Sequence, residues 1–188
     1  MGIRTVRTEG DECLRKVCKP VKSVSLRTRI LIEDMFDTMY ESGGVGLAAP
    51  QIGVLKRIVV MDTDDNQHVL INPQILEVSG EQTGYEGCLS IPGKSGIVTR
   101  PDYVKVKALN ERGEEYVLEG EGLLARCICH ECDHLDGILY SDKAEGGLIN
   151  NEDLPEDEEE EKSEEAETEE EAETGESEET DSEETTEE

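Results

Sequence analysis

The chain has 188 residues, with 47 Asp and Glu against 18 Lys and Arg, and its formal net charge is −29. From Asn151 onward there are 23 acidic residues and one basic residue, so residues 151–188 carry −22 and residues 1–150 carry −7. The extreme acidity belongs to the C-terminal part, and it excludes neither a fold nor a substrate for residues 1–150. A chain of this length accommodates one folded domain.

The sequence lacks the features of a secreted or membrane-spanning protein. The N-terminal MGIRTVRTEGDE has no apolar signal segment, and no later segment is apolar enough to cross a bilayer. In this context the six cysteines favour free thiols or metal ligands over a disulfide framework. We therefore expect a cytoplasmic protein with no membrane partner.

A helix is the first element that the pattern predicts, over residues 25–42. Ser25 is a suitable N-cap, and Gly43-Gly44 provide a stop. The apolar residues that follow helical spacing are Leu26, Ile30, Met35 and Met39.

Strands and a second helix follow. Segments rich in β-branched and other apolar residues predict strands at 57–61, 68–76, 103–109 and 114–120. The last two are expected to form a hairpin around Arg112-Gly113. A final helix is expected over 122–136, ending at Gly137. This order predicts an α+β domain over residues 1–150, with short mixed or antiparallel strands packed around the C-terminal helix.

Residues 151–188 form a separate segment by composition. They contain almost no apolar side chains and therefore cannot offset the entropy lost on ordering. We expect a disordered acidic tail that acts mainly on solubility, with docking to basic partners as the alternative.

The C-terminal helix carries the metal-binding pattern HECDHLDG, residues 130–137. His130 and His134 lie one helical turn apart on the same face, whereas Cys132 lies on the opposite side and is expected in the core. The side chain of Glu131 is long enough to reach a metal-bound water without being a ligand. Asp133 lies either behind the ligands or at the surface. Catalytic zinc needs a third protein ligand, and no His follows His134.

Two upstream stretches supply a candidate third ligand and a candidate hydrogen-bond donor. GYEGCLSIPG, residues 84–93, places Cys88 in an extended segment, and Cys plus two His is a catalytic ligand set with a free fourth position. GGVGLAAPQIG, residues 43–53, permits close backbone approach and offers the amide of Gln51. Alone, this glycine-rich stretch is equally well explained as a tight turn.

Together, GVGLAAPQ, EGCLS and HECDHLDG occur in the order and approximate spacing of peptide deformylases, which residues 3–142 closely resemble. The N-terminal GDECLRKVCKPV is similar to that family's opening. The resemblance implies three metal ligands, Cys88, His130 and His134. It also implies Glu131 as general acid and base, with Gln51 and the N–H of Leu89 as oxyanion donors. The substrate-binding positions that it implies are Gly44, Val45, Gly46, Glu86, Gly87 and Cys127.

The resemblance further implies hydrolysis of the N-formyl group from formylmethionyl nascent peptides, with one Fe²⁺ per chain and Zn²⁺ or another divalent metal as the alternative. It implies transient ribosome association at most, without direct nucleic acid binding. Cys129, where Gln is common, and Arg126, near the side-chain pocket, depart from the usual pattern. Other functions consistent with the residues are a zinc metalloendopeptidase, a non-catalytic structural zinc module, and a thiol hydrolase in which Cys88 attacks.

Overall fold

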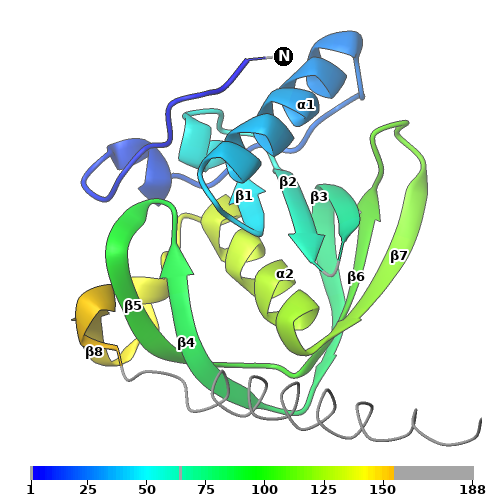
Figure 1. Cartoon of the computed structure of the whole chain (residues 1–188). Coiled ribbons are helices and arrows are strands. Elements are labelled where there is room, and N and C mark those ends of the chain that lie inside the picture. The colour runs from blue at the N-terminus through cyan, green and yellow to red at the C-terminus, as the bar shows by residue number, and fades with distance from the viewer. Residues whose placement is uncertain (1, 64, 155–188) are drawn as a thin grey trace, which may run out of the picture. The chain divides into compact units, whose positions relative to one another are not determined.

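The computed structural model describes residues 2–63 and 65–154 (Figure 1). The described part of the predicted tail contains a short 3-10 helix, η4 (Asn151–Asp153). Residues 155–188 lie outside the described part, so their disorder stays a prediction. Three other 3-10 helices are η1 (Glu12–Arg15), η2 (Ala49–Ile52) and η3 (Tyr140–Asp142).

The predicted N-terminal helix is confirmed as α1 (Leu26–Glu41). Ser25 caps it, because its Oγ accepts a hydrogen bond from the Thr28 N–H at 3.3 Å. The helix ends before Gly43, whose φ of +67° is easily adopted only by glycine. Its buried face packs on β1 and β2, whereas Leu26 and Ile30 in its first two turns are exposed.

The predicted strands belong to a five-stranded antiparallel sheet in the order β1-β2-β3-β6-β7. The strands are β1 (Gly46–Ala48), β2 (Ile58–Thr63), β3 (Asn66–Ser79), β6 (Tyr103–Leu109) and β7 (Glu115–Glu121). The expected β6–β7 hairpin is confirmed, and its turn includes Gly113 with a φ of +82°. Strand β1 was not predicted, because its three residues are too few to show a period.

A second antiparallel sheet contains β4 (Gln82–Cys88), β5 (Ile91–Arg100) and β8 (Glu145–Asn150), in the order β4-β5-β8. Strands β5 and β8 were not predicted. Their sequences, IPGKSGIVTR and EGGLIN, begin with residues typical of turns, and neighbouring strands rather than local preference hold them extended.

The C-terminal helix α2 (Gly122–Leu135) lies between the two sheets, as Figure 1 shows, and it contacts β1, β2, β6 and β7 of one and β5 of the other. The α+β class is confirmed, with antiparallel strands around this helix. One face of α2 packs in an apolar cluster on the larger sheet that includes Ile128, Cys129 and Cys132. The expected burial of Cys132 is confirmed, and the remaining face of α2 is free to form a site.

Candidate metal and catalytic site

A cavity of about 610 Å³ is formed between the segment after α1, strands β4 and β5, and helix α2. Every site residue expected from the sequence except His134 lines it. These residues are Gly44, Val45, Gly46, Gln51, Glu86, Gly87, Cys88, Leu89, Cys127, His130 and Glu131. His134 lies next to the cavity wall, because its Nε2 is 3.2 Å from the Cys88 Sγ.

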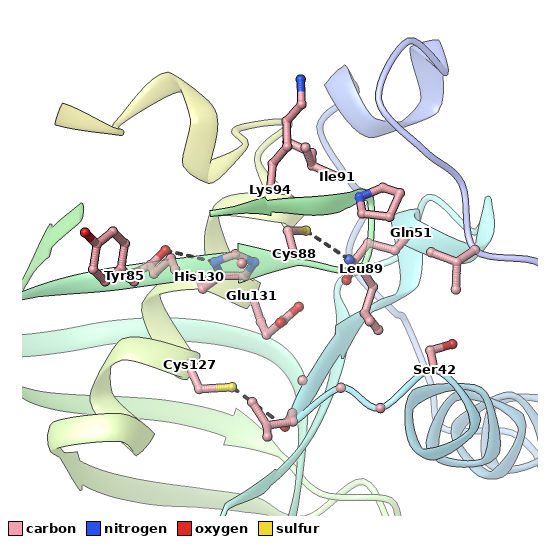
Figure 2. Close-up of a pocket in the computed structure, with 18 of the residues that line it drawn as sticks. Ser42, Gln51, Tyr85, Cys88, Leu89, Ile91, Lys94, Cys127, His130 and Glu131 are labelled. Atoms are coloured by element: carbon pink, nitrogen blue, oxygen red, sulfur yellow. Dashed lines mark hydrogen bonds and ion pairs between the residues drawn. The ribbon is translucent and has the colours of Figure 1, made fainter. Parts of the chain in front are cut away.

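The three expected ligands come together. The thiol of Cys88 and one nitrogen each of His130 and His134 all lie within 4.8 Å of one another. Helix α2 places the two imidazoles one turn apart with ring centroids 5.0 Å apart, and Cys88 ends strand β4 at a bulge in the β4–β5 pairing. Figure 2 shows Cys88, His130 and Glu131 converging on one space. This donor set and spacing fit one divalent transition metal ion.

The charges around His130 favour a cation at this position. Although burial disfavours its charged form, hydrogen bonds with Cys88 and Glu86 raise the pKa of His130 to about 10. Burial and the neighbouring His130 hold the pKa of His134 well below its usual value, which keeps that imidazole neutral as a metal ligand requires. The same negative groups that stabilise an imidazolium would stabilise a bound metal ion.

Glu131 stands beside the three ligands with an unpaired oxygen. Its Oε2 is buried without a hydrogen-bond partner in the described part of the chain. Burial raises the pKa of Glu131 to about 7, with the nearby carboxylate of Glu86 adding to the effect. A buried carboxyl group that titrates near neutrality is suited to accept and return a proton.

The glycine-rich segment makes room for this carboxylate. A Cβ added at Gly46 would lie 2.5 Å from Glu131 Oε1 and 2.8 Å from the Cys127 Sγ. A Cβ at Gly44 would lie 2.7 Å from a methyl carbon of Leu89. The turn explanation fits Gly43, whereas at Gly46 an added side chain would also collide with the site residues Cys127 and Glu131.

Gln51 is fixed with its amide nitrogen towards the ligands. Its Oε1 accepts a hydrogen bond from the Ala48 N–H at 2.8 Å. Its Nε2 lies 3.5 Å from the Cys88 Sγ and 3.2 Å from the Ser90 Oγ. The 3-10 helix η2 thus presents a donor at the ligand cluster.

Glu86 makes contacts that the sequence did not predict. Arg100 donates to both carboxylate oxygens at 2.8 and 2.9 Å, and His130 Nδ1 lies 3.0 Å from Oε2. Arg126 also donates to Oε1 at 3.0 Å. Despite the cost of burial, the hydrogen bonds from Arg100 and His130 lower the pKa of Glu86 to about 2. This carboxylate is occupied by protein groups, so its geometry suits the orientation of His130 better than contact with substrate.

Comparison with known proteins agrees with this geometry. The polypeptide deformylase family profile matches residues 3–150. The chain belongs to this family. The peptide deformylase of Agathobacter rectalis is 59% identical over 158 residues, which cover 83% of this chain and 100% of that protein. That of Lachnoclostridium phytofermentans is 55% identical over 163 residues, covering 85% and 100%.

Solved structures of peptide deformylases share the fold. The structure from Thermotoga maritima has a TM-score of 0.76 at 42% identity, covering 77% of this chain and 99% of that one. The structure from Legionella pneumophila has a TM-score of 0.74 at 47% identity, covering 77% and 88%. This deformylase family member is therefore a metal-dependent hydrolase.

Sequence reasoning missed three residues of this deformylase site. Arg100 holds Glu86 and also donates to Asp133 Oδ2 at 2.5 Å, which places Asp133 behind the ligands rather than free at the surface. Tyr140 stacks on His130 with ring centroids 6.0 Å apart. Ser90 contacts Gln51. No local pattern distinguishes these residues, because each reaches the site through the pairing of β4 with β5 or through the packing of η3.

Proposed function

We propose that this enzyme removes the N-formyl group of formylmethionyl nascent polypeptides at the Cys88, His130 and His134 cluster, with Glu131 as general acid and base. The observation that carries the proposal is the buried Oε2 of Glu131, which has no hydrogen-bond partner among residues 2–63 and 65–154 and lies beside three convergent ligand atoms. The products are formate and a polypeptide with a free amino terminus.

Cys88, His130 and His134 would hold the metal ion. A divalent ion there supplies a Lewis acid, which makes water nucleophilic near neutral pH. We propose Fe²⁺ as the native ion, one per chain, with Zn²⁺ or another divalent metal as the alternative, since thiolate and imidazole ligands suit both. Glu86 and Arg100 hold His130 in orientation through the Nδ1 contact of 3.0 Å.

Glu131 and Gln51 would handle the proton and the developing charge. The Glu131 carboxylate accepts a proton from the attacking water and later delivers it to the leaving amine, which is otherwise a poor leaving group. Nε2 of Gln51 and the backbone N–H of Leu89 would donate to the oxyanion of the tetrahedral intermediate. The position of Nε2, 3.5 Å from the Cys88 Sγ, supports this role.

The cavity walls would hold the formylated residue. Gly44, Val45, Gly46 and Gly87 would offer backbone groups for an extended peptide, and Cys127 would contribute an apolar part of the wall. We propose transient ribosome association in the cytoplasm, where formylated chains emerge. No helix within the described residues has the length and apolar character needed to cross a membrane.

The test is formate release from a formyl-Met-Ala peptide by anaerobically purified enzyme, with metal content measured on the same sample. Glu131→Gln is expected to retain the metal while turnover falls by about 10²–10⁴-fold, the usual effect of losing a general acid and base. Loss of metal in this variant would show that Glu131 is structural. Cleavage at internal peptide bonds would indicate an endopeptidase, and full activity after metal removal would indicate a thiol mechanism.

A further inference from the structure

Several exposed cations of this acidic protein lack an ion pair among the described residues. The described residues contain 17 Lys and Arg, and 11 of them form ion pairs. Of the six described cations without an ion pair, one is Lys94. The other five are exposed: Lys19, Lys22, Arg27, Arg29 and Lys56. The three lysines line one open cavity of about 440 Å³, and the two arginines are the sequence neighbours of Thr28, which also lines it.

The two sequence stretches that contribute the lining of this cavity contain no acidic residues. Residues 13–32 and 42–61 contain no Asp or Glu, although 47 of the 188 residues in the chain are acidic. Lys19, Lys22 and Lys56 line the cavity with the polar residues Ser23 and Thr28. Arg27 and Arg29 flank Thr28 on the first turn of α1, where the positive end of the helix dipole adds to their charge.

The backbone holds these lysines together. The Lys19 N–H donates to the Leu55 carbonyl at 3.1 Å, and the Arg57 N–H donates to the Lys19 carbonyl at 3.0 Å. Asn72, with a φ of +53°, fixes the same segment through two hydrogen bonds of 2.8 Å with the Val21 backbone. Like charges held close together repel one another, and a bound anion would relieve that repulsion.

We propose that the surface formed by Lys19, Lys22, Arg27, Arg29 and Lys56 binds the phosphate backbone of RNA. The choice of RNA rests on the proposed function, because nascent substrates are carried on an RNA-rich particle. A concave group of lysines suits a strand of phosphates better than the flat plane of a bilayer. No aromatic side chain lines the cavity among the described residues, so binding is independent of base sequence. The sequence alone led us to expect no direct nucleic acid binding, and this proposal differs from that expectation.

The test measures binding of the full-length enzyme to a single-stranded RNA of about 20 nucleotides, by fluorescence anisotropy at about 50 to 200 mM salt. The variant K19Q/K22Q/K56Q removes three charges from the surface. The matched control K105Q/K107Q/R112Q removes three charges from the β6–β7 hairpin, where each has an acidic partner. Formate release from a short formylated peptide, assayed in parallel, shows whether each variant is folded and keeps the deformylase test separate.

The wild-type enzyme is expected to bind with a Kd of about 10⁻⁴–10⁻⁶ M, typical of non-specific contacts. The surface variant is expected to lose affinity about tenfold or more, with the slope of log K against log salt reduced by roughly 2, and the control to change little. An equal loss in the control, or no binding by the wild type at the lowest salt, would overturn the proposal. Stronger binding to phosphatidylglycerol vesicles than to RNA at the same salt would also overturn it, in favour of a membrane surface.

Discussion

Gly46 and Glu131 approach each other so closely that no side chain fits between them, since a Cβ at Gly46 would lie 2.5 Å from Glu131 Oε1. The pair joins the loop after α1 to the ligand helix α2. The glycine-rich segment therefore determines where the carboxylate of the ligand helix can stand.

Gly46→Ala is expected to reduce kcat by on the order of 10²-fold, because the new methyl group displaces the Glu131 carboxylate by about 1 Å. Gly84→Ala is the matched control, since its Cβ would lie 3.4 Å from Arg126 Nη2, an ordinary contact. Steady-state kinetics on a formylated peptide, with thermal melts of both variants, give the comparison. Equal activity in the two variants would show that Glu131 tolerates the added methyl group.

Cys88→Ser and Cys132→Ser should behave oppositely. Cys88 contributes Sγ to the ligand cluster, whereas Cys132 is buried in the apolar cluster on the larger sheet. We expect Cys88→Ser to lose most of its bound metal and Cys132→Ser to retain it. Elemental analysis after anaerobic purification measures both, and comparable metal loss in the two would contradict the ligand assignment.

Glu86→Gln is expected to weaken metal binding by about 10–100-fold, because His130 loses the carboxylate that orients it. Competition with a chelator measures the affinity directly. Glu145→Gln, which alters an exposed carboxylate of β8, is the control. If Glu86→Gln changed only KM, with metal affinity intact, the residue would instead contact substrate.

Gln51→Ala should lower kcat by about 10²–10³-fold, the usual effect of removing one oxyanion donor. Ser90→Ala removes the hydroxyl that Gln51 Nε2 contacts at 3.2 Å but keeps the amide, and it should retain most activity. Kinetics of both variants over a range of peptide concentrations separate kcat from KM. An effect of Gln51→Ala on KM alone would assign Gln51 to substrate binding.

Asp34 offers a test of stability away from the site. Hydrogen bonds from Arg4 and from the Gly2 N–H hold the pKa of Asp34 below its usual value. Its carboxylate therefore stabilises the fold above the unfolded-state pKa of roughly 4, and this contribution is lost as the pH falls through the lower folded-state pKa.

Asp34→Asn should accordingly reduce the free energy of unfolding by about 1–2 kcal/mol at neutral pH. Urea unfolding at a series of pH values measures the difference from the wild type, which should shrink below a pH of roughly 4. A difference that stayed constant down to pH 3 or so would mean that the ionised carboxylate is not what stabilises the N-terminal segment.

Much of the site could be predicted from the sequence because its chemistry is encoded locally. Helical spacing alone places His130 and His134 on one face. The position of Glu131 on the same helix predicts that its carboxylate lies near the two imidazoles. Cys132 was assigned to the core on the same grounds, and it lies there. Helix α1, the β6–β7 hairpin and the α+β class also follow from local periodicity, capping and turn residues.

Only the tertiary structure decided which distant residues meet. Arg100 reaches Glu86 because β4 and β5 pair, and Gly46 meets Glu131 because β1 and α2 pack together. Lys19, Lys22 and Lys56 line one cavity because the backbone of residue 19 lies beside that of residue 56. Such relations depend on pairing and packing between segments far apart in the chain. Local sequence patterns do not predict these long-range contacts, because the interactions that stabilise them form only when the segments pack together.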